Sequence, residues 1–87
     1  MQFFPFVENL RIPFQFNPTL DGVDYIATVL WNVAGERYYV KIMDAQGRLI
    51  INTPMIESND VRDISLVAGI FKSKLVYRVS TNQFEVI

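Results

Sequence analysis

Few residues of this chain could make or break bonds, because its 87 residues include no His and no Cys. Enzymes usually recruit these side chains, or paired carboxylates, as general bases and nucleophiles. Ser58, Ser65 and Thr81 therefore have no histidine to activate them, and no Ser-His-Asp triad can form. The glycines are isolated from one another, so no Gly-rich phosphate loop is present. We expect a protein that is not an enzyme.

Two pairs of carboxylates are the remaining candidates for chemistry. Asp21 lies close to Asp24 in the sequence, and Asp60 lies close to Asp63. Calcium takes about six to eight oxygen ligands from a denser loop than either segment offers. Asp21 followed by Gly22 is typical of a tight turn. We therefore expect no metal site and no cofactor.

The elements that would carry these side chains are β-strands. Between Leu20 and Asn52, β-type segments are separated by turns at Asp21-Gly22, at Ala34 to Glu36 and at Asp44 to Gly47. Glycine near each reversal supplies the positive φ that a tight turn needs. This pattern predicts a β-meander.

Alternation of apolar and polar residues predicts five to six strands, and the fold class is all-β. Wrapping into a small single-domain β-barrel or β-sandwich would remove exposed strand edges. Pro13 cannot donate to a sheet ladder, so its strand should be an edge strand or leave the sheet partway. The segment 55–73 fits neither period well: Val61 to Phe71 could be one irregular helical turn or an extended piece kinked at Gly69, and we favour the extended form. The predicted strands are Leu10 to Phe16, Asp24 to Asn32, Arg37 to Met43, Arg48 to Thr53, Lys74 to Thr81 and Phe84 to Ile87.

The period of two also predicts which side chains point inward. In the third strand these are Tyr38, Val40 and Ile42, with Arg37, Tyr39 and Lys41 outward. The second strand is apolar on both faces, which is typical of a central strand or of one covered by a second subunit. The other inward predictions are Leu49, Ile50, Ile51, Leu75, Tyr77 and Val79.

Composition limits the classes of partner. The net charge is −1, which offers no field for a polyanion, so nucleic acid is not expected. No apolar run approaches the roughly 20 residues that span a bilayer, so no membrane is expected. Phe3 to Val7 is too short for a signal-peptide core, and we expect no targeting signal. Hydrophobic residues nevertheless make up 51% of this single domain, 1–87, and we expect the surplus to form protein contacts.

The candidate contact residues are aromatic. An interaction arm within residues 1–8, which becomes ordered only on a neighbouring subunit, is predicted from Phe3, Phe4 and Phe6. The alternative is that this segment is simply a free, disordered terminus. Tyr39 and Trp31 are further candidates for the interface, although either could belong to the core.

One alternative is a single-stranded nucleic-acid module. The strand Arg37 to Lys41 alternates basic and aromatic residues, and with Lys74 and Arg78 it could form a stacking platform. Glu36 and Asp44 bracket that strand, however, and the same alternation is ordinary for an outward strand face. A protein adaptor domain is a second alternative.

Several segments resemble a family of small phage tail proteins, the cyanophage-type baseplate plug family. The most telling part is the pattern Leu-Asp-Gly-x-x-Tyr, followed by Trp-Asn and an aromatic-rich strand. The resemblance spans about Leu10 to the C-terminus. Its segments are Leu20-Asp21-Gly22-Val23-Asp24-Tyr25, Val29-Leu30-Trp31-Asn32, Glu36-Arg37-Tyr38-Tyr39-Val40, Asp44-Ala45-Gln46-Gly47 and Asn82-Gln83-Phe84-Glu85-Val86.

The resemblance implies a β-rich, non-enzymatic structural component at the centre of a tail baseplate. Its expected partners are other baseplate and tail proteins, and self-association into a homo-oligomer stays open. The expected location is the virion, after assembly in the cytoplasm of the host bacterium.

Overall fold

The computed structural model describes residues 1–8 and 11–87, and these residues form strands, turns and loops with no helix. Strands are more numerous than the sequence predicts, because short strands also form outside the predicted ones, at Gln2–Pro5, Thr19–Leu20 and Glu57–Ser58, and several of the predicted strands are shorter than expected. Ten are formed: β1 (Gln2–Pro5), β2 (Phe14–Phe16), β3 (Thr19–Leu20), β4 (Val23–Asp24), β5 (Ile26–Asn32), β6 (Arg37–Met43), β7 (Leu49–Pro54), β8 (Glu57–Ser58), β9 (Leu75–Arg78) and β10 (Gln83–Val86).

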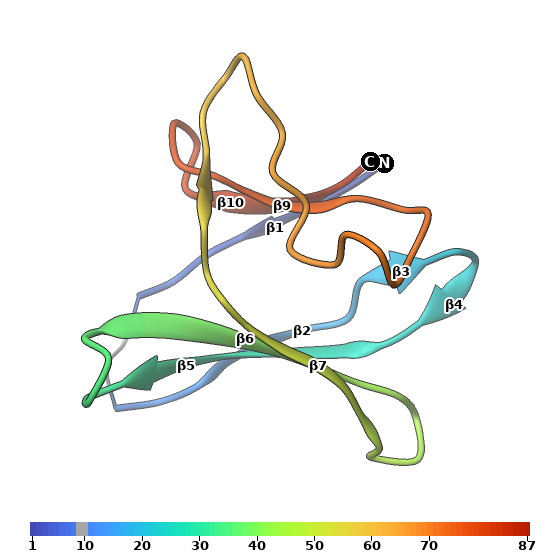
Figure 1. Ribbon diagram of the computed structural model, residues 1–87, viewed down its shortest axis with the longest axis horizontal. Coiled ribbons are helices and arrows are strands. Elements are labelled where there is room, and N and C mark those ends of the chain that lie inside the picture. Colours follow the sequence, from blue (N-terminus) through green and yellow to red (C-terminus); the bar gives the residue numbers. More distant parts are fainter. Residues whose placement is uncertain (9–10) are drawn as a thin grey trace.

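Two four-stranded sheets form two layers, with the short β3–β4 hairpin at one side (Figure 1). One sheet has the order β2-β5-β6-β7 and the other the order β1-β10-β9-β8. Among the described residues no strand pairing joins the two sheets, so the strands do not form a closed barrel. The chain passes from the lower layer to the upper one between β7 and β8 (Figure 1).

The predicted meander is the run β5-β6-β7, in which each strand pairs antiparallel with the next. Its second turn forms as the sequence predicts. The Asp44 carboxylate accepts the N–H groups of Gln46 and Arg48, both at 2.9 Å, and Gly47 has a φ of 80°. The predicted strand Leu10 to Phe16 is reduced to β2, which begins directly after Pro13 and lies at the edge of this sheet, while Leu10 lies outside the described residues.

The N-terminus is a strand, and this corrects the expectation of a free arm. β1 pairs antiparallel with β10, from Gln2 opposite Val86 to Pro5 opposite Gln83. The two chain ends therefore lie side by side (Figure 1). The Gln2 side chain also bonds Thr19, accepting its N–H at 2.8 Å.

The segment 55–73 contains the two residues of β8 and no helix, but residues 66–70 form a turn, so the favoured extended form is only partly correct. Two inward predictions are wrong, because Leu49 is 53% exposed and Val79 is 43% exposed. Leu49 pairs with Met43 at a register shift that leaves Ile50 without an opposite residue, and Val79 lies beyond the end of β9. A bulge or a strand end breaks the period of two on which both predictions depended.

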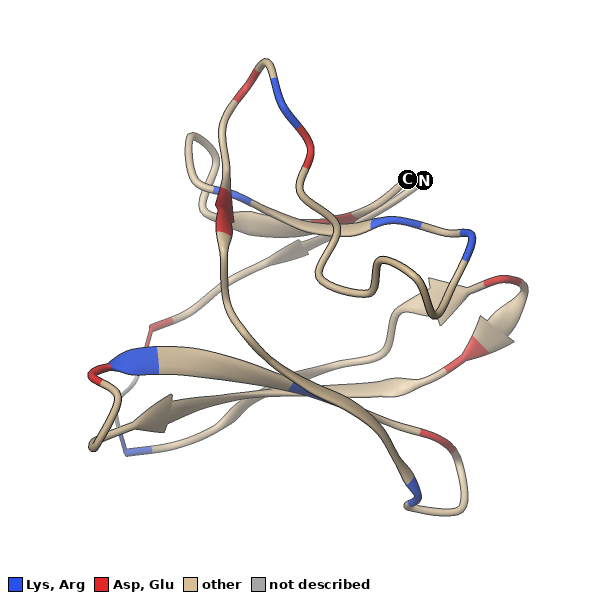
Figure 2. Cartoon of the chain, viewed as in Figure 1, with Lys and Arg blue, Asp and Glu red and all other residues tan. Residues whose placement is uncertain are grey.

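One hydrophobic cluster fills the space between the sheets and takes side chains from both. Phe84, Leu20, Ile42 and Leu75 are among its fully buried members. Charged residues of both signs are scattered along the chain around it (Figure 2). Within the described residues, no helix has the length and apolar content needed to cross a membrane.

Candidate functional site

The three phenylalanines of the N-terminal segment have different environments. Phe6 is only 4% exposed and makes edge-to-face contacts with Phe14, Tyr38 and Phe84. Phe4 is half-buried, with its ring centre 4.9 Å from that of Phe16. Phe3, on the opposite face of β1, is 52% exposed. Phe6 and Phe4 therefore belong to the hydrophobic cluster, and of the three only Phe3 is largely exposed.

Trp31 and Tyr39, the other predicted contact residues, lie on neighbouring strands with their side chains on opposite faces of the sheet, because Trp31 pairs with Tyr38 and Tyr39 pairs with Leu30. They line one hollow of about 410 Å³ on the β2-β5-β6-β7 sheet, together with Leu30, Asn32, Lys41 and Asn52. The Trp31 ring also meets Tyr38 edge-on, with ring centres 5.0 Å apart. Both residues are half-buried; Trp31 packs on Tyr38, whereas Tyr39 lies on the outward side of β6.

The hollow belongs to a larger surface on the outer face of this sheet. Val40 and Ile42 point into the core, so their neighbours along β6 point away from it. Strand register aligns the outward residues into rows that cross β5, β6 and β7. We call this surface the Tyr39 face; its apolar members are Ile26, Leu30, Tyr39, Met43, Leu49 and Pro54, and its polar members are Thr28, Lys41 and Asn52.

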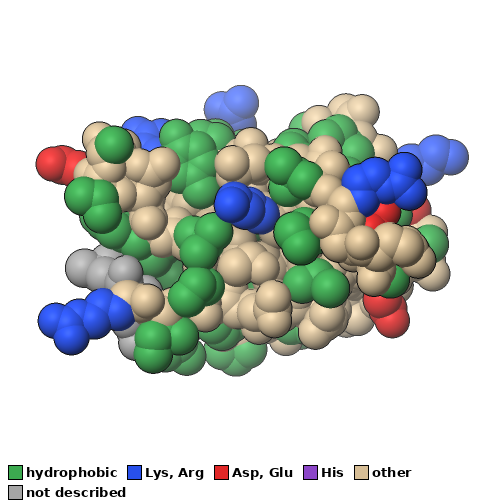
Figure 3. Space-filling view, turned by 90° about the horizontal axis from the view of Figure 1, so that it is seen from below, with side chains coloured by type: hydrophobic (Ala, Val, Ile, Leu, Met, Phe, Trp, Pro, Cys, Tyr) green, Lys and Arg blue, Asp and Glu red, His purple; other side chains and the backbone are tan. Residues whose placement is uncertain are grey.

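The Tyr39 face combines apolar side chains with a single positive charge at its centre. Figure 3 shows hydrophobic side chains gathered over this sheet around a basic one. Register places Lys41 between Thr28 and Asn52, with an apolar row on either side. A rigid sheet that carries such rows can bury apolar area against a partner with little loss of conformational entropy.

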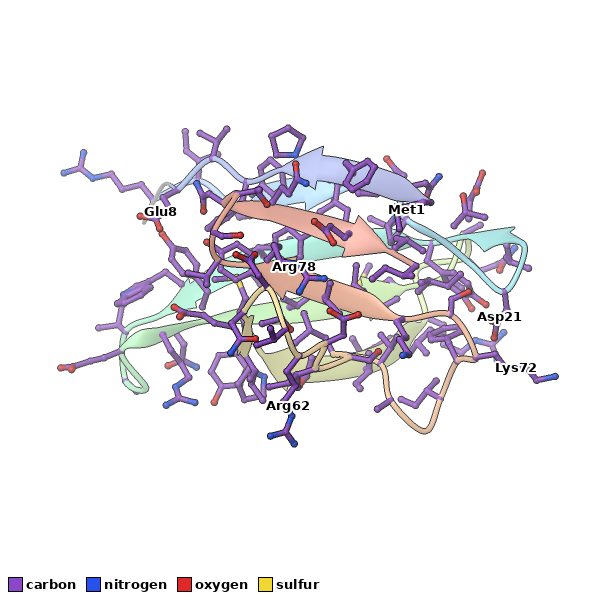
Figure 4. All side chains as sticks on the ribbon, turned by 90° about the horizontal axis from the view of Figure 1, so that it is seen from above. Met1, Glu8, Asp21, Arg62, Lys72 and Arg78 are labelled. Atoms are coloured by element: carbon purple, nitrogen blue, oxygen red, sulfur yellow. The ribbon has the colours of Figure 1, made fainter. Side chains whose placement is uncertain are left out.

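The nucleic-acid platform considered from the sequence is not assembled. Lys41 and Arg37 lie on β6, whereas Arg78 lies on β9 in the other sheet. Arg78 is also engaged, because its guanidinium binds Asp63 at 2.6 Å and Glu85 at 3.1 Å. These carboxylates hold the pKa of Arg78 above its usual value. Figure 4 shows Arg78 over the middle of the β1-β10-β9-β8 sheet.

The carboxylates considered as metal ligands each have a structural partner. Asp21 accepts N–H groups of Lys72 and Ser73, at 3.0 and 2.8 Å, and these bonds lower its pKa. Asp24 accepts the Thr19 hydroxyl at 2.6 Å. Over residues 1–8 and 11–87, no group of three or more acidic side chains lies close enough to hold a metal ion. These bonds hold loops in place, within one hairpin for Asp24 and between distant segments for Asp21.

Ser58 likewise has a structural partner. It is fully buried, and its hydroxyl oxygen accepts the Ile64 N–H at 2.9 Å. This bond fixes the start of the loop between β8 and β9.

Sequence reasoning missed a second concave site at the end of the molecule that carries the β5–β6 turn. We call it the Trp31 cavity; its volume is about 430 Å³, and its lining includes Glu8, Trp31, Glu36, Tyr38, Glu57 and Tyr77. These residues come from distant parts of the chain, so no local pattern could have indicated the site. The signal in the sequence that could have indicated this site is the presence of acidic and aromatic residues, such as Trp31 and Glu36, near the ends of predicted strands.

Comparison with known protein families, with curated proteins and with solved structures finds no match for this chain.

Proposed function

We propose that this protein is a non-enzymatic structural subunit, a small two-layer β-sandwich that docks its Tyr39 face on another protein. The observation that carries the proposal is the alignment of Leu30 with Tyr39 and Pro54, and of Ile26 with Met43, on one solvent-facing sheet surface. Apolar side chains gathered on one accessible face, as in these two rows on either side of Lys41, mark interaction sites in soluble proteins. Aromatic residues such as Tyr39 are enriched at the centres of protein interfaces.

We further propose that the partner is another protein of a phage tail baseplate, and that the protein works in the virion. Support comes from the resemblance to the baseplate plug family. The segments Trp31-Asn32 and Tyr38-Tyr39-Val40, which are its rarer elements, lie on β5 and β6. Tyr39 itself belongs to the proposed docking surface, so the resemblance and the surface argument converge on the same strand.

Incorporation into particles tests the proposal. Tagged wild-type chain and a Leu30→Glu, Tyr39→Glu variant are expressed in a host that produces the phage, and purified particles are probed for the tag. The double variant should keep its fold, because both side chains point away from the core, and should be lost from particles. Buried carboxylates without partners are costly at an interface.

Val61→Glu is the matched control. Val61 is 92% exposed, outside the Tyr39 face. This variant should enter particles like the wild type. Equal incorporation of the double variant contradicts docking through the Tyr39 face, and absence of the wild type from particles contradicts the virion assignment.

A further inference from the structure

The Trp31 cavity has a chemistry distinct from that of the Tyr39 face. Its lining contains three aromatic rings, those of Trp31, Tyr38 and Tyr77, and the carboxylates of Glu8, Glu36 and Glu57. In Figure 4, Glu8 lies at the end of the molecule opposite Asp21 and Lys72. A cavity of about 430 Å³ is large enough for one long side chain of a partner.

Core contacts fix the aromatic rings of the cavity. Tyr38 meets Trp31 edge-on, with ring centres 5.0 Å apart. Phe6 contacts both tyrosines from the core side, at 5.3 Å from Tyr38 and 5.9 Å from Tyr77. The rings are therefore preorganised, and a ligand would not have to order them.

The electrostatic balance of the cavity favours a cation. Its lining carries three glutamates and one arginine, Arg37, so its formal charge is −2. The Glu8 charge reaches into the site, because it adds to the effect of burial in raising the pKa of Tyr38 and of Tyr77. Glu57 raises the pKa of Tyr77 further.

One hydrogen-bonding group of the cavity wall is unsatisfied. The Tyr38 hydroxyl oxygen is buried and has no hydrogen-bond partner among the residues that the structure describes. The Tyr77 hydroxyl, in contrast, donates to the side-chain oxygen of Asn82. A phenolic hydroxyl can both accept and donate a hydrogen bond, so the Tyr38 oxygen is a potential partner for a polar group in the cavity, and the charge of the lining is what favours a cation.

We propose that the Trp31 cavity receives a lysine or arginine side chain of a partner protein. The cation would contact the aromatic rings through their negative faces and lie among the glutamate carboxylates. This inference rests on the proposed function, because it names the chemistry that the partner presents beside the Tyr39 face.

The test uses Trp31, the single tryptophan of the chain, as a fluorescent reporter. The full chain is titrated with Nα-acetyl-lysine methylamide, and in parallel with the neutral analogue that carries an acetyl group on Nε, at constant ionic strength. The cationic probe should give a saturable change in emission, and the neutral analogue should not. The Trp31 indole N–H resonance in NMR spectra provides a second readout of the same binding.

Charge variants give effects of opposite sign, which a merely structural role would not produce. Glu8→Gln with Glu57→Gln should weaken binding of the lysine probe about tenfold, and Arg37→Gln should tighten it about threefold. Asp60→Asn is the matched control, because it removes a carboxylate that does not line the cavity. It should leave the affinity unchanged, and thermal melts should verify that every variant is folded.

Binding of both probes with equal affinity overturns the inference, as does the absence of a saturable response in both fluorescence and NMR. Neither result touches the particle test of the Tyr39 face. A subunit that enters particles without binding the lysine probe would retain the proposed function and lose only the cation site.

Discussion

Two hydrogen bonds join the main chain of Phe6 to Asn82, although the two residues lie 76 positions apart in the sequence. The Phe6 N–H donates to the Asn82 carbonyl at 3.0 Å, and the Asn82 side-chain amide donates to the Phe6 carbonyl at 3.2 Å. Asn82 has a φ of 51°, which lets the β9–β10 turn present both groups toward the N-terminal segment. The start of the chain is thereby fastened to its end.

Phe6→Ala should destabilise the protein strongly. Truncating a buried phenylalanine costs about 3 to 5 kcal/mol, a large part of the stability expected for a domain of this size. Phe3→Ala is the matched control, since Phe3 is 52% exposed and its truncation should stay within about 0.5 kcal/mol. Urea unfolding of both variants measures the difference. Equal midpoints for the two variants would contradict the placement of Phe6.

Deletion of Met1 to Val7 should prevent stable folding, because it removes β1 and leaves the edge of β10 unpaired. Far-ultraviolet circular dichroism and a thermal melt of the truncated chain test this. A cooperative melt at the wild-type midpoint would restore the idea of a dispensable arm.

Asp21 should make stability depend on pH in the acid range. Hydrogen bonds from the Lys72 and Ser73 N–H groups lower the pKa of Asp21 in the folded state below its usual value of 3.8. A carboxyl group with a lowered pKa stabilises the fold above the unfolded-state pKa, and this contribution is lost as the pH falls through the folded-state pKa. Asp21→Asn should therefore lower the melting temperature at neutral pH and lose this part of the acid dependence.

Asp44→Asn is the comparison for Asp21. Asp44 also has a lowered pKa, with the Arg48 N–H as the largest cause, but its bonds stay within one turn. Asp21 instead connects segments 52 positions apart. Asp21→Asn should therefore expose the loop around Ser73 to amide hydrogen exchange, whereas Asp44→Asn should affect only its own hairpin. Unchanged exchange at Ser73 would show that the Asp21 bonds do not hold this loop.

Two tyrosines should titrate late in alkali. Burial raises the pKa of Tyr38 and of Tyr77 above the usual 10.0, with Glu8 adding to both. Because the pKa of each tyrosine is higher in the folded state than in the unfolded state, the protonated hydroxyls stabilise the fold below the unfolded-state pKa. This contribution to the free energy of unfolding is lost as the pH rises through the folded-state pKa. Tyrosinate absorbance during a pH titration measures this. Glu8→Gln should bring both transitions to lower pH, and transitions unmoved by this change would contradict the placement of Glu8.

Arg78→Lys should loosen the loop between β8 and β9. The separate nitrogens of the guanidinium reach the Asn59 carbonyl and both carboxylates, Asp63 and Glu85, whereas the single nitrogen of a lysine cannot lie close to all three at once. Limited proteolysis should cut this loop several times faster than in wild type. Arg62→Lys, a change at an exposed position of the same loop, is the control and should leave the cleavage rate unchanged. Equal cleavage in the two variants would contradict the role of Arg78.

The sequence by itself determined the local features of this protein. Alternation in Arg37 to Met43 predicted β6 with its inward and outward faces, and Asp44 with Gly47 predicted the turn that follows. These features depend on side-chain direction and turn conformation within a few residues, so a local pattern is sufficient. The absence of His and Cys is equally a property of the sequence.

Only the tertiary structure decided which distant segments meet. It paired β1 with β10, placed Phe6 in the core, and brought Glu8 to the same cavity as Trp31 and Tyr77. Pairing of β1 with β10 requires the intervening chain to fold so that its two ends meet. The residues of one strand do not specify locally which other strand it pairs with. A phenylalanine is equally hydrophobic in an exposed interaction arm and in a core. Only the residues that surround Phe6 in the folded protein show that it belongs to the core.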